Sequence, residues 1–131
     1  MSTGYSEQQL DHYLAIMDRV AELWVQQFPE RATYSLGYWH LFMGLYKHRK
    51  HAITKGEAAE FLTAAQIKSP ATRAKVIAGA IKLGYVSEQK SNVDKRANLV
   101  KMTPKLEHKM QAYLSASLQA MSEALQSIHT G

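Results

Sequence analysis

The chain has 131 residues, which fits a single domain, and its 46% hydrophobic content is ordinary for a globular protein. No apolar run approaches the ~18 residues that a membrane-spanning helix needs, so we expect no membrane contact. The absence of cysteine excludes disulfides, and the first residues lack the basic start and apolar core of a signal peptide. Both features favour a cytoplasmic protein.

The net charge is +5, and it is unevenly distributed along the chain. Residues 47–109 carry fourteen basic and five acidic side chains, whereas the segments on either side are slightly acidic. A positive field gathered in one segment favours a polyanionic partner such as nucleic acid. The alternative interpretation is that these cations only solvate a surface.

Two helices are predicted in the acidic first third of the chain. Residues 6–28 place apolar side chains at three- or four-residue steps, and Pro29 ends the pattern. This stripe consists of Leu10, Leu14, Met17, Ala21, Trp24 and Phe28. Residues 33–48 form the second predicted helix. Its aromatic stripe is either part of the core or the lining of a pocket for an aromatic ligand, formed by Trp39, Phe42, Met43 and Tyr46.

A basic loop, residues 47–51, follows the second helix. His48 and His51 lie three residues apart, a spacing that can bring two imidazoles to one metal ion. Three cations surround them and no carboxylate stands nearby, so we predict no metal site. Contact with phosphates, or simple solvation, fits this loop better.

The basic segment then predicts a helix-turn-helix. Thr54 and Glu57 form a capping box at the start of a helix over residues 54–65. Ser69 is a plausible N-cap for the next helix, which Gly84 ends. On that helix the apolar positions 76, 77, 80 and 83 define the buried face. The side chains predicted to reach bases and phosphates are Ser69, Thr72, Arg73 and Lys75.

A basic hairpin follows this helix. Tyr85 and Val86 open one β-type run, Leu99 to Met102 form a second, and residues 91–96 between them are rich in turn formers. A helix followed by a basic two-stranded wing is the pattern of a winged helix-turn-helix, in which the helix enters the major groove of DNA. The predicted fold is therefore mainly α with a small β-wing, of the α+β class.

The last predicted helix begins with Thr103 as N-cap and Pro104 as first residue. Its apolar stripe consists of Leu106, Met110, Tyr113, Leu114, Leu118, Met121 and Leu125. A helix of this length with one apolar face and few neighbours requires a partner, and a second copy of the chain would supply it.

Four pieces of the chain together resemble the multiple-antibiotic-resistance regulator (MarR) family. They are Ser69-Pro70-Ala71-Thr72, Lys82-Leu83-Gly84-Tyr85-Val86, Asp94-Lys95-Arg96 and Lys101-Met102-Thr103-Pro104-Lys105. The resemblance is sharpest over residues 53–105. It implies one domain over 1–131, with a winged-helix DNA-binding core at 33–103 and dimerisation helices at 6–32 and 104–128.

The resemblance also implies roles for individual residues. Arg96 would reach the minor groove or the DNA backbone, Lys95 would assist it, and Asp94 would hold the wing through an ion pair. The chain departs from the family at Arg73, where an apolar residue is usual, and at Ala97, where a second arginine is common. Either Arg73 extends the end of its side chain to a phosphate, or the predicted helical register is shifted by one residue. In the family, a small aromatic acid often binds between the DNA-binding core and the dimerisation helices.

The predicted function is that of a homodimeric transcriptional regulator, more often a repressor in this family, which binds double-stranded DNA at a palindromic operator. We predict no cofactor and no enzymatic activity, since the sequence shows no nucleotide-binding glycine loop and no catalytic pattern. One alternative is a winged-helix module for protein interaction, or an accessory factor in replication or transfer. A second is a ligand or metal sensor whose role on DNA is secondary.

Overall fold

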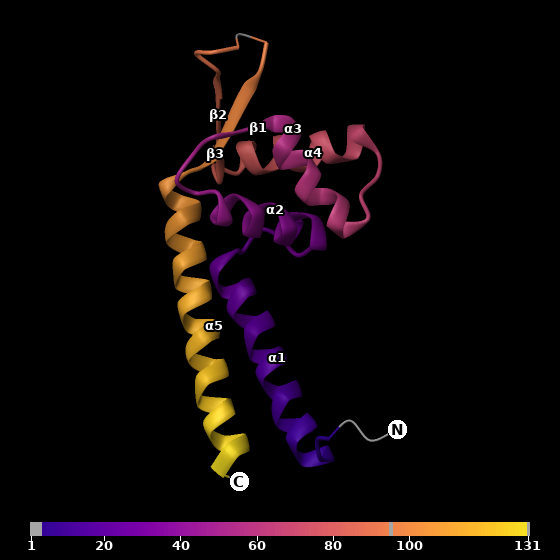
Figure 1. Ribbon diagram of the computed structural model, residues 1–131, viewed down its shortest axis with the longest axis vertical. Coiled ribbons are helices and arrows are strands. Elements are labelled where there is room, and N and C mark those ends of the chain that lie inside the picture. Colours follow the sequence, from indigo (N-terminus) through magenta and orange to yellow (C-terminus); the bar gives the residue numbers. More distant parts are fainter. Residues whose placement is uncertain (1–3, 95, 131) are drawn as a thin grey trace. The chain divides into compact units, whose positions relative to one another are not determined.

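A computed structural model describes residues 4–94 and 96–130 of the chain (Figure 1). It is mainly helical, with one three-stranded antiparallel sheet in the strand order β1-β3-β2. The elements are α1 (Glu7–Gln27), a 3₁₀ turn (Arg31–Thr33), α2 (Leu36–Lys47), β1 (Ile53–Thr54), α3 (Lys55–Phe61), a second 3₁₀ turn (Leu62–Ala65), α4 (Pro70–Lys82), β2 (Val86–Lys90), β3 (Asn98–Met102) and α5 (Pro104–Thr130).

The contacts within the chain define two compact units. Residues 30–110 form one unit, which we call the winged-helix unit, and the residues up to 29 and from 111 form the other, which we call the helical-pair unit. Helix α5 contributes to both, because the boundary falls between Met110 and Gln111. Among the described residues, no helix is both long and apolar enough to span a membrane.

In the helical-pair unit, α1 starts at a capping box. The Ser6 hydroxyl accepts the backbone N–H of Gln9, whose side chain accepts the N–H of Ser6. The rings of Trp24 on α1 and Tyr113 on α5 pack edge to face, 5.0 Å apart. The predicted apolar stripe on α1 is divided between two environments. Trp24 and Phe28 are buried, whereas the large side chains nearer the N-terminus are exposed, namely Leu10, Leu14 and Met17.

The winged-helix unit is built around aromatic residues. The ring of Phe42 on α2 meets Tyr38 at 5.6 Å and Tyr85 at 5.4 Å, both edge to face. All three side chains are buried. Aliphatic side chains from four further elements complete this core, including Leu62, Ile77, Val100, Leu106 and Met110.

Helices α2 and α3 approach each other at a glycine. A Cβ atom at Gly44 would overlap the ring of Phe61, so only glycine lets the aromatic ring lie directly against the α2 backbone. The capping box of Thr54 and Glu57 is confirmed by reciprocal hydrogen bonds of 3.1 Å. The single helix predicted over residues 54–65 is wrong in its last turn, however. There the chain tightens to a 3₁₀ turn that ends at Gln66, with φ of 62°.

The predicted hairpin is present, and the sheet has one further strand. In the hairpin, Val86 lies opposite Met102 and Lys90 lies opposite Asn98. Strand β2 continues from Val86 through polar residues to Lys90. Only its first residue is buried, so the rest of the strand shows no apolar alternation in the sequence. The third strand is β1, which pairs Ile53 with Val100. Two residues are too few for a periodic signal, so the sequence pattern missed it.

Candidate nucleic-acid interface

Helix α4 begins as its sequence predicts. Ser69 is the N-cap, and its hydroxyl accepts the backbone N–H of Thr72 at 3.3 Å. Pro70 is the first helical residue, where its missing N–H costs no hydrogen bond. The Ser69 hydroxyl still has its own proton to donate, so capping leaves it able to contact an acceptor such as a phosphate oxygen.

The predicted contact residues of α4 lie on two different faces of the helix. Thr72 and Lys75 are exposed, as are the small side chains of Ala71, Ala74 and Ala78 between them. A face of this kind has few donors and little bulk, so it can approach another molecule closely. Together with Ser69, these residues form the surface that we call the α4 face.

Arg73 lies apart from the α4 face. It precedes the buried Ile77 by four residues, so its stem points toward the packed side of the helix. The side chain is partly buried, and its Nε atom is buried without a hydrogen-bond partner among the described residues. Of the predicted contact residues on this helix, Arg73 is therefore the one that the structure separates from Thr72 and Lys75.

The end of α4 is joined to the start of α5 by side chains. Gly84 adopts φ of +83°, the left-handed conformation that ends helices and favours glycine. Thr103 donates its hydroxyl to the Gly84 carbonyl at 2.7 Å and accepts the N–H of Leu106. Lys105 donates to the Leu83 carbonyl at 3.0 Å, which places its charge at the negative end of the α4 dipole. Lys105 thus has a structural partner within the unit.

Tyr85 connects this junction to the beginning of the winged-helix unit. Its hydroxyl donates to the Glu30 carboxylate, with 2.5 and 2.7 Å to the two oxygens. Burial, followed by this hydrogen bond to a carboxylate, raises the pKa of Tyr85 well above its ordinary value of 10.0. The pair links residues 55 positions apart, and no local sequence signal predicts it.

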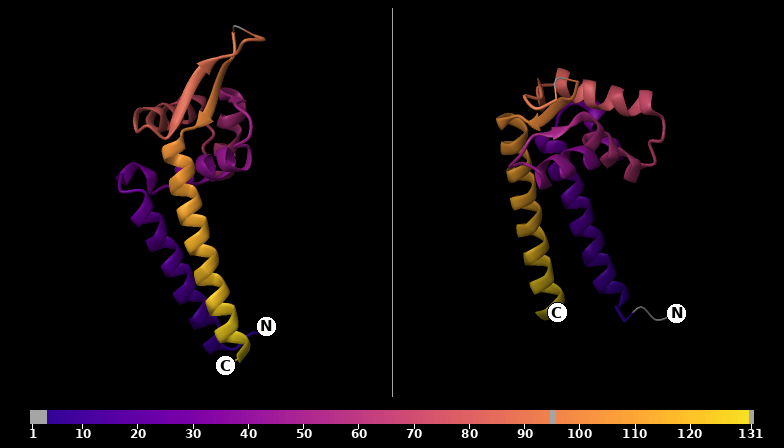
Figure 2. Two further views of the ribbon diagram at one scale, coloured as in Figure 1. Left: turned by 90° about the vertical axis from the view of Figure 1, so that its left-hand side faces the viewer. Right: turned by 45° about the horizontal axis from the view of Figure 1, so that its top comes forward.

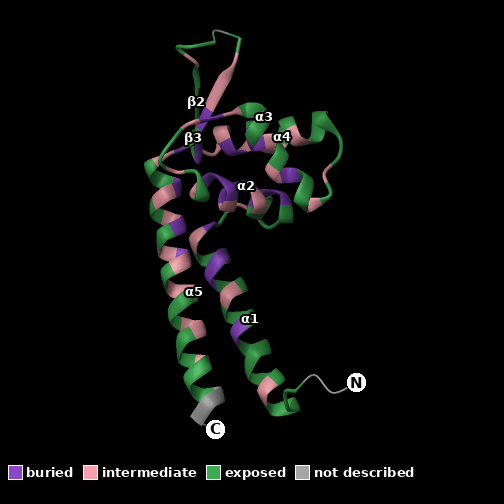
Figure 3. Cartoon of the chain, in the orientation of Figure 1, coloured by how far each residue is buried: buried purple, intermediate pink, exposed green. Residues whose placement is uncertain are grey.

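The hairpin of β2 and β3 extends from the winged-helix unit beside α4 (Figures 1 and 2). Beyond its base, the hairpin residues that the structure describes are exposed or intermediate (Figure 3). Near the base Lys55 and Glu88 form an ion pair with an N–O distance of 2.6 Å, which attaches β2 to the first residue of α3. This ion pair was not anticipated from the sequence.

The turn of the hairpin is held by its own short side chains. The Ser91 hydroxyl accepts the N–H groups of Val93 and Asp94, both at 3.2 Å. One carboxylate oxygen of Asp94 accepts the N–H of Arg96 at 3.0 Å. Asp94 therefore structures the turn through a backbone hydrogen bond, and the side chain of Arg96 is exposed. Lys95, also predicted to contact DNA, lies outside the described residues.

The basic loop after α2 is organised by aromatic contacts. His48 stacks on the ring of Phe61 at 5.6 Å, and the guanidinium of Arg49 lies 4.3 Å from the centre of the Tyr46 ring. Lys47, Lys50 and His51 are exposed. Within residues 4–94 and 96–130, no trio of histidine, aspartate or glutamate side chains is placed to hold a metal ion.

The four residues proposed for an aromatic pocket have different surroundings. Phe42 has no exposed surface and belongs to the core. Trp39 is 37% exposed and packs its ring against His40, while Met43 and Tyr46 are partly exposed. In this conformation a ligand can therefore contact Trp39 but not Phe42.

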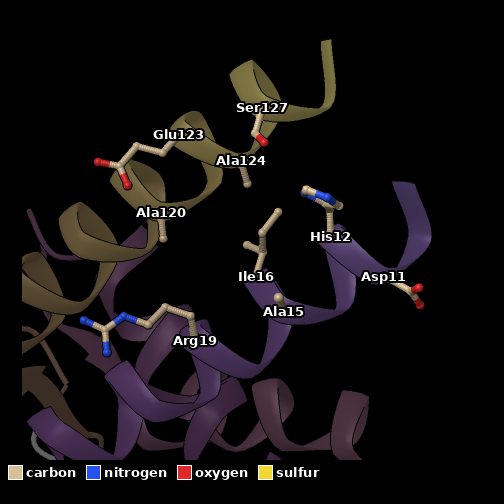
Figure 4. A pocket seen from close by; sticks show the side chains of 9 residues that line it. All are labelled: Asp11, His12, Ala15, Ile16, Arg19, Ala120, Glu123, Ala124 and Ser127. Atoms are coloured by element: carbon tan, nitrogen blue, oxygen red, sulfur yellow. The ribbon is translucent and has the colours of Figure 1, made fainter. Parts of the chain in front are cut away.

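A pocket of about 540 Å³ lies elsewhere, between α1 and α5 of the helical-pair unit (Figure 4). Its apolar wall includes Ile16 and three alanines. The charged and polar side chains around it are Asp11, His12, Arg19, Glu123 and Ser127. Charged groups of both signs therefore line this pocket.

Comparison with solved structures identifies the fold. A variant of S. aureus MepR bound to an oligodeoxyribonucleotide has a TM-score of 0.68 at 15% sequence identity, over 94% of this chain and 83% of that one. S. aureus MepR bound to ethidium bromide has a TM-score of 0.63 at 17% identity, over 96% and 84%. A putative MarR-like transcription regulator from Bacillus cereus has a TM-score of 0.57 at 18% identity, over 88% and 76%.

No family model and no curated protein sequence matches the chain. Identities this low establish the fold alone. The chain has the MarR-like winged-helix fold, and the predicted resemblance is confirmed at that level.

Proposed function

We propose that this chain is a MarR-like transcriptional regulator that binds double-stranded DNA as a homodimer. The observation that carries the proposal is the exposed α4 face, on a helix that contacts β2 of a hairpin with an exposed arginine, within the one strongly basic segment of the chain. The matched fold has been solved on an oligodeoxyribonucleotide in one relative. A DNA target would agree with the cytoplasmic location that the sequence favours.

The α4 face fits the major groove. Thr72 and Lys75 would contact base edges and phosphates, and the alanines between them permit close approach. Few hydrogen-bonding groups are exposed here, so sequence preference would depend partly on DNA shape. Arg73, whose stem is packed, would reach a phosphate with the end of its guanidinium rather than a base.

The hairpin would flank this contact. Arg96 is exposed and its backbone is fixed by Asp94, so it is prepared to enter the minor groove or bind a phosphate. Lys95 would add a second charge, and the basic loop at residues 47–51 would contribute phosphate contacts at the edge of the interface.

Exposed apolar side chains support a homodimer. On α1, Leu10, Leu14 and Met17 follow helical spacing and are about half exposed or more. On α5, Leu118 and Leu125 lie two turns apart and are also exposed. A monomer would leave this surface in water, and a second copy of the chain would cover it. Two-fold symmetry then predicts a palindromic operator.

A small aromatic effector stays a prediction. Binding near Trp39 would act by shifting the population between DNA-binding and non-binding arrangements of the dimer. A thermal-shift assay with salicylate and with zinc addresses this point. No shift with either would argue against a sensing role.

The DNA-binding proposal is tested by the salt dependence of affinity. A regulator with ~6–10 phosphate contacts should lose roughly 10³–10⁵ in affinity for random duplex DNA between ~50 and ~200 mM salt. Arg96→Ala should weaken binding to all sequences and reduce the slope of log affinity against log salt by about one. Fluorescence anisotropy measures both quantities.

Arg31→Ala is the matched control, because it removes an exposed arginine outside the basic segment and should leave the slope unchanged. An unchanged slope for Arg96→Ala would exclude the wing from the interface. Absent or salt-insensitive binding by the unmodified protein would favour the alternative, a winged-helix module for protein interaction.

A further inference from the structure

The tip of the hairpin carries an apolar side chain with no packing role. Val93 is 98% exposed, the highest exposure of any large apolar residue among those the structure describes. Its neighbours Asn92, Asp94 and Arg96 are polar and exposed. A valine in this position adds nothing to the core. Any apolar contact of its side chain is therefore with another molecule.

The backbone that presents Val93 is held in place. Its N–H donates to the Ser91 hydroxyl, and Ser91 and Ala97 close the turn beneath it through a backbone hydrogen bond of 3.0 Å. The next residue is also tied down, because its N–H donates to the same hydroxyl. Val93 therefore projects from an ordered turn, and little conformational entropy is lost when it docks.

The charge around Val93 indicates what it docks against. One oxygen of the Asp94 carboxylate accepts the backbone N–H of Arg96, so this acidic group is held against the turn, and Glu88 at the base of the hairpin is paired with Lys55. Arg96 near the tip and Lys90 on β2 are exposed. One valine ringed by polar groups is too small an apolar surface for a protein interface, which needs an anchor of several apolar side chains. A polyanion with an apolar-walled groove fits better.

We propose that Val93 is the apolar tip of the wing, that it enters the minor groove of duplex DNA, and that it gives the chain a preference for base pairs without the guanine 2-amino group. This inference rests on the proposed function. In the minor groove A·T pairs present only acceptors, whereas G·C pairs add the N2 amino donor. The valine methyl groups would cover that donor and leave it without a partner, which is unfavourable.

Three duplex polymers separate this contact from the reading of the major groove. Inosine is guanine without the 2-amino group, so poly(dI-dC) presents the minor groove of A·T pairs and the major groove of G·C pairs. The affinity ratio of poly(dI-dC) to poly(dG-dC) therefore reports the minor groove. Poly(dA-dT) is the third probe, and it should bind like poly(dI-dC) if this contact dominates the preference.

We expect the unmodified protein to bind poly(dI-dC) about three- to tenfold more tightly than poly(dG-dC) at fixed salt, the factor that corresponds to a cost of about 0.7–1.4 kcal/mol for one covered donor without a partner. Val93→Thr keeps the shape but replaces a methyl by a hydroxyl, and it should bring that ratio close to one. Val93→Ile keeps the side chain apolar and should retain the preference. Because the position is exposed, thermal unfolding should not distinguish the three proteins.

Two results would overturn the inference while leaving DNA binding intact. The first is a ratio of one for the unmodified protein, and the second is the same ratio for Val93→Thr and the unmodified protein. Failure of the unmodified protein to bind any of the three polymers would refute the proposed function itself.

Discussion

Tyr85 contacts three separate segments of the winged-helix unit. Its ring lies in the core against Phe42, its hydroxyl is bound by Glu30, and Lys105 Nζ sits 4.6 Å from the ring centre. The segment before α2, the end of α4 and the start of α5 therefore meet at one residue. The Glu30 carboxylate satisfies a hydroxyl that would otherwise be buried without a partner.

Removing that hydroxyl should destabilise the fold. Tyr85→Phe leaves the Glu30 carboxylate without its donor, and we expect the free energy of unfolding to fall by about 1.5–3 kcal/mol. Urea unfolding followed by circular dichroism measures the change. Tyr13→Phe is the control, because that tyrosine is exposed on α1 and its hydroxyl should contribute little. Equal stabilities of the two variants would contradict the role of the pair.

The hydrogen bond between Tyr85 and Glu30 should also make the free energy of unfolding depend on pH. The pKa of Tyr85 is raised in the folded chain, so as pH rises past 10.0 the unfolded chain loses this proton first. The stability due to the neutral phenol is thus complete below about pH 10 and declines above it. The difference in unfolding free energy between the unmodified protein and Tyr85→Phe should accordingly be the same at about pH 8 and about pH 9 and smaller at about pH 11.

Local residue roles could be predicted from the sequence, and long-range ones could not. Ser69, Thr54 and Gly84 act within a few residues of themselves, and their cap and stop roles are confirmed. The partnership of Tyr85 with Glu30 requires the folded chain. The position of Arg73 follows from the helical register that the sequence itself indicated, since it lies one turn before Ile77.

At the scale of elements, close contact between α2 and α3 depends on Gly44. The Phe61 ring occupies the space where a Cβ would be, and it stacks with the ring of His48. A glycine inside a helix lowers the intrinsic stability of that helix. Its role is clear only when the residue that fills the space is known.

Gly44→Ala should destabilise the winged-helix unit. Alanine improves helix propensity by about 0.5–1 kcal/mol, but overlap with the Phe61 ring should cost about 1–3 kcal/mol, so a net loss is expected. Gly56→Ala in α3 is the matched control, because its Cβ would meet only the Thr54 hydroxyl at 3.8 Å. That variant should gain stability. A gain for both variants in thermal unfolding would show that Phe61 moves aside freely.

The elements themselves were predictable where their periodicity was long. Helices α1, α2, α4 and α5 have apolar steps and terminal signals that identify them, and the wing follows from its turn formers. Strand β1 is too short to show alternation. The 3₁₀ turn after α3 has a helical composition, and only its packing separates it from an α-helix.

At the scale of the whole molecule, the two units have different surface chemistry. The winged-helix unit holds all of the positive excess, the helical-pair unit is net acidic, and the helical-pair unit holds most of the exposed large apolar side chains among the described residues. Repulsion between two basic surfaces opposes their association, so self-association is expected through the apolar helices. Each copy then contributes one α4 face to the same duplex.

Substitutions in the exposed apolar surface of α1 and α5 should abolish dimerisation without removing the DNA-binding residues of each chain. Leu14→Glu and Leu118→Glu each place a charge on this surface, and we expect both variants to be monomers at concentrations where the unmodified protein is a dimer. Sedimentation equilibrium measures the mass, and Gln8→Glu is the control, since it adds the same charge to α1 at an exposed polar position.

The monomeric variants should still bind single half-sites, because each chain keeps its own α4 face and wing. They should lose the added affinity for palindromes whose half-sites lie about 34–36 Å apart, one turn of DNA. A random DNA pool selected by the unmodified protein supplies those palindromes. If Leu14→Glu and Leu118→Glu remain dimeric, or if the selected sites have no two-fold symmetry, the helical-pair unit does not assemble the regulator through this surface.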